Sequence, residues 1–384
     1  MRTGRASGSA RLSDAVLQAP VPPVWMRWLP AGYVAAVLLL EPVTPVEWPV
    51  SFLLVALPVI AASSLGPLAV AGVSVFSVCL EGLLAGSTCC AGRSAHDLWE
   101  RHYVGAYVST AVVGILGTAL AAHRTRQEAR LVHANSVSKE LMRTLLRPVP
   151  RRIGNVRAAG LYRPAEALVG GDLFDLRATP AGERAVIGDV RGKGLPAVRT
   201  VADLLGCFRQ TAYESGDLLE VAGSMERCIV REAGGAPDDE LFVTAALVEY
   251  DPHAQRVTVV NCGHIEPVLI SRGEVHTLTG PPSLPLGLGA LSAERPRAHT
   301  HRFVPGDVLL LCTDGLIEAR DPAGSFYPLL DRLHDRFAGR PAPDPFEVVD
   351  FLDTDLPRYA RTLHDDVAVL AIAPHESPRT QDRA

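Results

Sequence analysis

The chain has 384 residues, enough for more than one domain, since a single domain usually holds about 100–200 residues. Its formal net charge of -5 argues against a nucleic-acid-binding protein, because such domains carry a strongly basic face. Hydrophobic residues make up 48% of the sequence, and the first third is nearly free of charge over long stretches, which indicates an apolar N-terminal region followed by a different domain.

Four apolar segments within the first 122 residues have lengths close to the roughly 20 residues that cross a bilayer as a helix. The last of them carries no charged residue, whereas the first is shorter and is interrupted by Arg27 and Pro30. The segments are 24–40, 46–64, 66–86 and 104–122. We therefore predict an N-terminal tail over residues 1–23 and a transmembrane region of about four helices over residues 24–122.

The arginines that flank this region predict its orientation, because short cytoplasmic flanks collect Lys and Arg. They lie before or near the start of the first segment and after the last one, at Arg2, Arg5, Arg11, Arg27, Arg124, Arg126 and Arg130. Both ends are then cytoplasmic, which requires an even number of crossings. A cleaved signal peptide is a poor alternative, since apolar segments recur well past residue 30. The sequence predicts a multi-pass protein of the plasma membrane with a cytoplasmic C-terminal domain.

Glu81 lies within the third apolar segment. A carboxylate in lipid is costly, so it is by default a functional feature. Because Glu81 is near the end of its segment, it can also simply reach the membrane interface, and both interpretations stay open.

Residues 123–147 contain no Gly or Pro and end before Pro148, as expected for a helix that continues from the last apolar segment. Apolar side chains lie roughly on one side of it, at Leu131, Val137, Leu141 and Leu145. The run is too short to establish a coiled coil, which needs three or four heptads. We predict a linker over residues 123–150, either a signalling helix that forms a homodimer or a spacer.

Residues 151–374 consist of short apolar runs separated by turn signals, with a few helical patterns. Hairpin signals such as Tyr250-Asp251-Pro252-His253 favour antiparallel pairing. Strands are predicted at 156–162, 173–178, 183–190, 241–250, 256–261, 268–271, 308–312 and 367–372, and helices at 195–215, 217–233 and 345–358. Runs of strands with inserted helices indicate an α+β domain, followed by a disordered tail over residues 375–384.

A glycine-rich turn, Gly188-Asp189-Val190-Arg191-Gly192-Lys193-Gly194, joins a predicted strand to a predicted helix. Three glycines allow the backbone to come close to something small and charged. The turn is not a P-loop, which needs four residues between its glycines and a Ser or Thr after the lysine. Asp189 is therefore the residue to explain.

Acidic residues stand at the ends of four predicted strands, at Asp172, Asp189, Asp314 and the pair Asp365-Asp366. Each site alone can be a turn, since Asp-Gly is a favoured turn dipeptide. Strand ends of a layered fold tend to converge, however, and clustered carboxylates repel one another and raise one another's pKa unless a cation neutralises them. Oxygen ligands without His or Cys favour Mg²⁺ or Mn²⁺ over Zn²⁺.

Eight short motifs occur in the order found in one protein family. They are LLRP (145–148), YRPA (162–165), VGGDLFD (169–175), GDVRGKGLPA (188–197), NCGH (261–264), PGD (305–307), TDG (313–315) and DD (365–366). Over residues 140–373 the chain thus resembles the SpoIIE/RsbU-like branch of the PPM-type (protein phosphatase 2C superfamily) serine/threonine phosphatases. The resemblance implies two antiparallel β-sheets packed as a sandwich, flanked by helices, with two divalent cations, Mn²⁺ or Mg²⁺, at one end.

The resemblance also implies the ligands of these cations. Asp189 matches the ligand that bridges both ions, the backbone carbonyl of Val190 joins Asp172 on one ion, and Asp314 and Asp365 hold the other. Such a pair of ions, about 4 Å apart, holds a shared water as hydroxide that attacks phosphorus directly.

Other matched positions carry no ligand role. Asp175 and Asp366 are expected just behind the ligands, and His264 is either a proton donor or the holder of a structural hydrogen bond. Two positions depart from the family pattern: Lys193 stands where many members have His, and Cys262 where Ala is usual. Neither touches a predicted ligand. The seven cysteines show no metal or disulfide spacing, and we predict no role for the adjacent Cys89 and Cys90.

The substrate implied by the resemblance is a phosphoserine or phosphothreonine on a regulatory protein, commonly an anti-sigma-factor antagonist, which would make the chain a signal-transduction enzyme of sigma-factor regulation. Two alternatives are a catalytically weak scaffold that binds phosphoproteins and a membrane sensor or transporter with an accessory soluble part. The presence of all four predicted aspartates favours the enzyme over the scaffold, and the few, nearly non-polar spans disfavour a transporter.

Overall fold

The computed structural model describes residues 24–44, 50–89, 101–166, 168–234, 241–280, 283–340 and 343–375. The chain divides into two compact units, Met1–Val132 and His133–Ala384. The predicted N-terminal tail, residues 376–384 of the predicted C-terminal tail, and Cys90 lie outside the described residues.

The N-terminal unit consists of apolar helices. They are η1 (Val24–Trp28), α2 (Leu29–Leu40), η2 (Glu41–Val43), η3 (Val50–Ala56), α3 (Leu57–Ala62), α4 (Pro67–Cys89) and the first part of α5 (Arg101–Leu145). Within the described part of the chain, three stretches are long and apolar enough to cross a membrane: Val24–Val43, Pro67–Ala85 and Val104–Leu145. The predicted span 46–64 differs, because its described part, Val50–Ala62, is a shorter helix in which 3-10 turns give way to α3, with Pro58 in the first turn of α3. Four crossings therefore stays a prediction.

Glu81 of α4 is buried within this unit, with 3% of its surface exposed. Its Oε1 accepts a hydrogen bond of 2.7 Å from the hydroxyl of Thr110 on α5. The two helices approach closely here, since a Cβ on Gly114 would lie 2.6 Å from the Cβ of Ser74. Small residues and a polar pair across the interface are typical of helix packing in membranes.

Helix α5 is continuous over 45 residues, which confirms that the last apolar segment extends into the predicted linker helix. At 1.5 Å per residue it is about 68 Å long, more than twice the thickness of a bilayer core. It ends at Leu145, three residues before Pro148, which cannot continue a helix. Its last turns belong to the C-terminal unit, where Met142 is fully buried and Asn135 Oδ1 accepts from the backbone N–H of Val169.

The C-terminal unit contains two antiparallel sheets. The six-stranded sheet has the order β1 (Arg152–Ile153), β2 (Val156–Arg163), β11 (Val367–Pro374), β10 (Val308–Cys312), β7 (Val268–Ser271) and β8 (Glu274–Thr277). The five-stranded sheet has the order β3 (Asp172–Thr179), β4 (Gly182–Val190), β5 (Val243–Asp251), β6 (Arg256–Cys262) and β9 (Ala298–Arg302). All eight predicted strands are present, and the three that were not predicted, β1, β8 and β9, are sheet edges.

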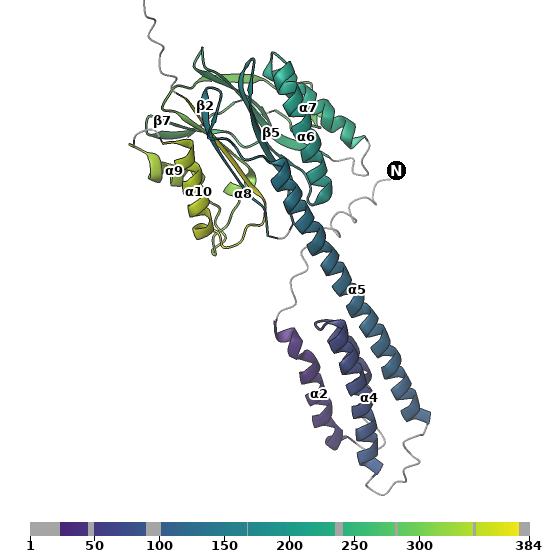
Figure 1. Cartoon of the computed structure of the whole chain (residues 1–384). Coiled ribbons are helices and arrows are strands. Elements are labelled where there is room, and N and C mark those ends of the chain that lie inside the picture. Colours follow the sequence, from purple (N-terminus) through teal and green to yellow (C-terminus); the bar gives the residue numbers. More distant parts are fainter. Residues whose placement is uncertain are drawn as a thin grey trace, which may run out of the picture. The chain divides into compact units, whose positions relative to one another are not determined.

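The sheets pack face to face with helices on both outer sides, as the alternation along β11 shows. Ala368, Leu370 and Ile372 point into the core between the sheets, whereas Val367 and Val369 point into a second core under the helices. Figure 1 shows α6 (Leu195–Glu214) and α7 (Leu218–Ala233) on one side, and α9 (Leu329–Phe337) and α10 (Pro345–Tyr359) on the other. The short α8 (Asp314–Ile317) and η5 (Gly289–Leu291) complete the unit. This confirms the predicted α+β sandwich.

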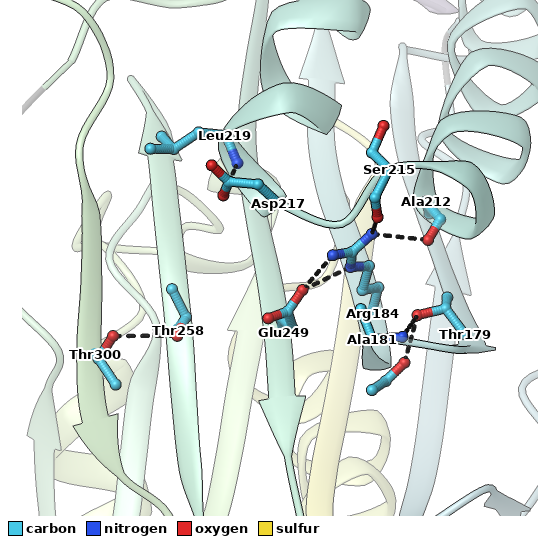
Figure 2. Close-up of polar contacts among 11 residues, drawn as sticks. Thr179, Ala181, Arg184, Ala212, Ser215, Asp217, Leu219, Glu249, Thr258 and Thr300 are labelled. Carbon is cyan, nitrogen blue, oxygen red and sulfur yellow. Dashed lines mark hydrogen bonds and ion pairs between the residues drawn. The ribbon is translucent and has the colours of Figure 1, made fainter. Parts of the chain in front are cut away.

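A fully buried arginine fixes α6 on the five-stranded sheet (Figure 2). Arg184 of β4 donates from Nε to Glu249 Oε2 on β5 over 2.7 Å. Its Nη1 donates to the carbonyl oxygens of Ala212 and Ser215, at 2.9 and 2.5 Å. Those carbonyls stand at the end of α6, where helical groups lack partners within the helix. Arg184 thus ties one end of α6 to the strand whose other end carries Asp189.

We predict that Arg184→Met destabilises the C-terminal unit by about 3–5 kcal/mol, because breaking a buried ion pair leaves its partner charge uncompensated. Methionine keeps most of the apolar packing but leaves Glu249 and the two carbonyls without the guanidinium. Scanning calorimetry of the full chain in detergent micelles should show a melting temperature lowered by roughly 10 °C.

The matched control is Arg297→Met, which removes an exposed guanidinium from the segment before β9. It should change the melting temperature by less than about 2 °C. Equal effects of the two substitutions would show that Arg184 does not hold the helix to the sheet.

Candidate metal centre

The β3–β4 hairpin places Asp172 directly opposite Asp189, as cross-strand partners. At this end, opposite the turn of the hairpin, the backbone N–H of Val190 donates to the Gly171 carbonyl over 3.1 Å and holds the two strands together. A Cβ at Gly171 would lie 2.4 Å from the carbonyl oxygen of Val190. Only glycine therefore permits this close approach of the two strands beside the aspartates.

Asp314 reaches the same place from the other sheet, because β10 ends at Cys312 and α8 begins at Asp314. Carboxylate oxygens of Asp172, Asp189 and Asp314 all lie within 4.8 Å of one another. Gly315 allows this turn, since a Cβ there would overlap the backbone carbonyl of Asp366. The structure thus brings three of the four predicted ligand side chains together.

Asp365 lies beside this group, where it is bound by a lysine. Its Oδ2 is 3.2 Å from Nζ of Lys193, so the expectation that Lys193 touches no predicted ligand is wrong. Its Oδ1 accepts from the backbone N–H of Asp366. Among the described residues, the compact group of metal-ligating atoms comprises only the other three aspartates. Asp365 is nevertheless close enough for its charge to raise the pKa of both Asp189 and Asp314, after the larger effect of their burial.

Burial and mutual repulsion raise the pKa of these carboxyl groups above the ordinary value for aspartate. Burial, followed by the charge of Asp189, raises the pKa of Asp172 well above its usual range. Burial, followed by the charges of Asp314 and Asp365, raises the pKa of Asp189 to about 7. Burial is also the main cause of the raised pKa of Asp314. The groups cannot all ionise together unless a cation joins them.

The donor set fits hard divalent cations. It consists of carboxylate oxygens, and the 4.8 Å span is comparable to the separation of oxygens around one or two cations with metal–oxygen distances of about 2.1 Å. The residues that would hold them are Asp172, Asp189 and Asp314, with the neighbouring Val190 carbonyl and Asp365.

Thr313 is a site residue for which the sequence predicted no role. Its hydroxyl donates to Asp172 Oδ2 over 2.6 Å and accepts from the backbone N–H of Ala368 over 2.9 Å. It therefore links β10 and β11 of one sheet to β3 of the other, and it leaves the second oxygen of Asp172 for a cation. The only signal in the sequence was its place in the TDG motif.

Asp366 and Asp175 accept hydrogen bonds from neighbouring residues of the protein. Asp366 is fully buried, accepting from the backbone N–H of Ala165 over 2.8 Å and from the hydroxyl of Tyr162 over 2.6 Å. It therefore positions the segment that leads to Gly170 and Gly171. Asp175 lies three residues from Asp172 along β3 and accepts from Nε of Arg209 on α6 over 2.5 Å.

His264 holds a structural position. Its Nε2 donates to the carbonyl of Cys312 over 3.1 Å, which leaves Nδ1 to accept from the hydroxyl of Thr244 over 3.0 Å. Burial lowers its pKa to about 4, so the ring is neutral at pH 7 with both nitrogens engaged. Burial also raises the pKa of the Cys262 and Cys312 thiols to about 12, which makes them inert as nucleophiles.

Comparisons with known proteins bear on the family and the fold of the chain. The family model described as "Stage II sporulation protein E (SpoIIE)" matches residues 180–375, about half of the chain. The SiaA-PP2C domain of Pseudomonas aeruginosa is 19% identical, with a TM-score of 0.51 over 66% of this chain and 98% of that one, which shows a shared fold. A comparison with curated proteins finds no match.

Two further solved structures are similar at TM-scores just under 0.5. The RsbU and RsbW domains of a Mycobacterium tuberculosis protein are 24% identical, with a TM-score of 0.49 over 59% of this chain and 63% of that one. The PP2C domain with a regulatory fragment of SpoIIE from Bacillus subtilis is 16% identical, with a TM-score of 0.48 over 58% and 63%. This chain thus spans less than two thirds of either protein.

We predict that the metal-free protein loses stability as the pH rises. An aspartate has a pKa near 4 when unfolded, so the raised pKa of Asp189 means that the folded state binds more protons between about pH 4 and 7. The stabilisation is complete below pH 4 and is lost as the pH passes 7. With EDTA present, the free energy of unfolding should be about 2–3 kcal/mol lower at pH 8 than at pH 5.

Calorimetric melting of the full chain measures this difference, and Mn²⁺ should restore stability at pH 8. Asp189→Asn is the informative variant, because a neutral amide needs no proton: without metal at pH 8 it should melt above the wild type. A metal-free wild type that is more stable at pH 8 than at pH 5 would contradict the clustering of ionisable carboxylates.

Proposed function

This chain belongs to the SpoIIE family, and we propose that it is a membrane-anchored, metal-dependent phosphatase that hydrolyses phosphoserine or phosphothreonine on a regulatory protein. The C-terminal unit is a PPM-type serine/threonine phosphatase domain with the corresponding two-sheet fold. The observation that carries the proposal is the group of three carboxylates, delivered by both sheets within 4.8 Å of one another.

The cofactors that we propose are two divalent cations, Mn²⁺ or Mg²⁺. Asp189 would contact both, Asp172 and the Val190 carbonyl would hold one, and Asp314 and Asp365 would hold the other. When bound, such cations lower the pKa of a water molecule and neutralise charge on the phosphoryl oxygens. The oxygen-only donor set and the repulsion among these carboxylates support this assignment.

The protein's own groups would position this chemistry. Thr313 fixes one oxygen of Asp172, and Gly171 allows the two strands to approach, so the carboxylates sit on rigid strand ends. A phosphocysteine route has no support, because Cys312, two residues before Asp314, is buried with a raised pKa, as is Cys262. His264 is neutral and engaged on both sides, so we assign it no proton transfer to the leaving oxygen.

We propose that the substrate is a small phosphorylated regulator of the anti-sigma-factor-antagonist kind, as the resemblance to the SpoIIE/RsbU-like branch implies. The enzyme would then act in sigma-factor regulation. The alternative function, a scaffold that binds phosphoproteins without hydrolysis, would leave these carboxylates without divalent cations. Among the described residues, the ion pair that Lys193 forms in this group is with Asp365.

We further propose that the apolar unit anchors the enzyme in the plasma membrane, with the phosphatase domain in the cytoplasm, and that α5 carries a regulatory signal. Within the C-terminal unit, Arg209 of α6 donates to the carbonyl of Leu145 at the end of α5 over 3.0 Å. The same guanidinium binds Asp175 on β3, the strand that begins with Asp172. A displacement at the end of α5 would therefore reach both α6 and β3.

The proposed homodimer forms through the 123–147 helix. Apolar side chains of α5 remain exposed in the single chain, with exposed fractions of 48% for Leu131, 38% for Val137 and 43% for Leu141. An apolar stripe of this kind is what a second copy of the helix would cover.

We predict that Asp189→Asn lowers Mn²⁺-dependent release of phosphate from a phosphoserine protein by roughly 10³-fold, because the ligand shared by both cations is lost. Phosphate release by the full chain in detergent micelles, with and without Mn²⁺, measures this loss. The matched control is Asp335→Asn, an exposed position on α9, which should leave the rate within about twofold. A scaffold would bind the phosphoprotein and release no phosphate in either variant or in the wild type.

Removal of residues 1–122 should abolish membrane attachment and leave Mn²⁺-dependent turnover within about tenfold of the full chain, because the carboxylates belong to the C-terminal unit. Fractionation should find the full chain in carbonate-washed membranes and the truncated chain in the supernatant. A truncated chain that cannot fold in solution would contradict the division into an anchoring and a catalytic part.

A further inference from the structure

Lys193 places an ammonium group on one of the proposed metal ligands. Its Nζ lies 3.2 Å from Oδ2 of Asp365 and donates to the carbonyl of His364 over 3.3 Å. The chain contains 35 arginines and only two lysines, Lys139 and Lys193. An ammonium is a compact point charge on a flexible stem, whereas a guanidinium grips a carboxylate with a planar fork.

We propose that Lys193 is a built-in competitor for the second cation: its ammonium holds Asp365 until a divalent cation displaces it, and this exchange sets the cation affinity of the site. The inference rests on the proposed function, since it takes Asp365 as a metal ligand. It assigns Lys193 a tuning role in cation binding, not a contact with the phosphoryl group.

The position of Asp365 supports the exchange. Asp172, Asp189 and Asp314 already form a compact group, whereas both oxygens of Asp365 are engaged elsewhere, one by Lys193 and one by the backbone N–H of Asp366. A cation held by Asp314 and Asp365 must therefore replace the ammonium as the partner of Asp365 Oδ2. The cost of breaking that ion pair is subtracted from the affinity for the cation.

The same ammonium also acts on Asp189. The charge of Lys193 acts on Asp189 in the sense opposite to the charges of Asp314, Asp365 and Asp366. A divalent cation that enters between Asp189 and Asp365 is repelled by this ammonium until the side chain moves away. Lys193 thus opposes the cation at two of its proposed ligands.

The surrounding turn permits such a movement. Its backbone is held at both ends, since Arg191 N–H donates to the Phe242 carbonyl over 3.1 Å and Gly194 N–H donates to the Val169 carbonyl over 2.7 Å. Gly192 and Gly194 have φ values of 112° and 78°, which only glycine adopts readily. A Cβ at either glycine would meet no described atom within 4 Å, so the turn is not packed closely at these two positions. The side chains of Lys193 and Asp365 are 40% and 45% exposed.

Calorimetric titration of the metal-free full chain with Mn²⁺, in detergent micelles, tests the proposal. Lys193→Met keeps the length of the side chain and removes its charge, so the weaker of the two Mn²⁺ sites should bind about fivefold more tightly, the equivalent of losing one partly exposed ion pair. Lys193→Arg keeps the charge and adds the fork, so its affinity should equal or fall below that of the wild type.

Lys139→Met is the matched control, because it removes the only other lysine from the surface of α5 and should leave Mn²⁺ affinity unchanged. A second readout needs no metal: with EDTA present, Lys193→Met should melt about 2 °C below the wild type, because Asp365 loses its partner. Loss of a merely structural contact would lower this melting temperature without tightening Mn²⁺ binding.

The proposal is overturned if Lys193→Met binds Mn²⁺ no more tightly than the wild type, or if Lys193→Arg binds as tightly as Lys193→Met. In that case a wild type that still binds Mn²⁺ and releases phosphate leaves the proposed function intact. A wild type that neither binds Mn²⁺ nor releases phosphate overturns the proposed function and this inference together.

Discussion

Repulsion among buried carboxylates is the constraint on which the rest of this structure depends. Asp172, Asp189 and Asp314 share a space in which their oxygens lie within 4.8 Å of one another, and burial strengthens every charge interaction there. Without a counter-charge these carboxyl groups retain protons in the folded state. The ionised state, which is the one that binds cations, is therefore disfavoured in the folded protein until a cation is present. The arrangement is therefore stable with protons or with cations, and a hydrolase that works near neutral pH requires the second.

The sandwich imposes this arrangement from both sheets. Strand β4 is fixed twice, by the Asp172–Asp189 register at one end and by the buried Arg184 toward the other, so α6 and the turn before it have a defined start. Near the proposed metal ligands, the hydrogen bond from Thr313 to Asp172 joins the two sheets. The carboxylates thus stand on strand ends that the core holds in place, while the side chains of Lys193 and Asp365 remain partly exposed.

Much of the fold could be predicted from the sequence, because short continuous apolar runs bounded by turn signals mark buried strands such as β10 and β11. The edge strands could not be predicted in this way. Strand β9 has the polar sequence Ala-His-Thr-His-Arg, and it is a strand because the fold places it beside β6, with which it pairs. Pairings between distant residues were equally hidden. Thr313 and Asp172 are 141 residues apart, and no local pattern marks one threonine as the partner of an aspartate. The hold of Lys193 on Asp365 likewise depends on the fold that joins them.

Anomalous diffraction at the manganese edge, from crystals of the full chain grown with Mn²⁺, tests most directly whether these carboxylates form a two-cation centre. We predict two peaks within coordinating distance of Asp189, one shared with Asp172 and the other with Asp314. A map with no manganese at Asp189, or with manganese only at carboxylates elsewhere on the molecule, would contradict the assignment.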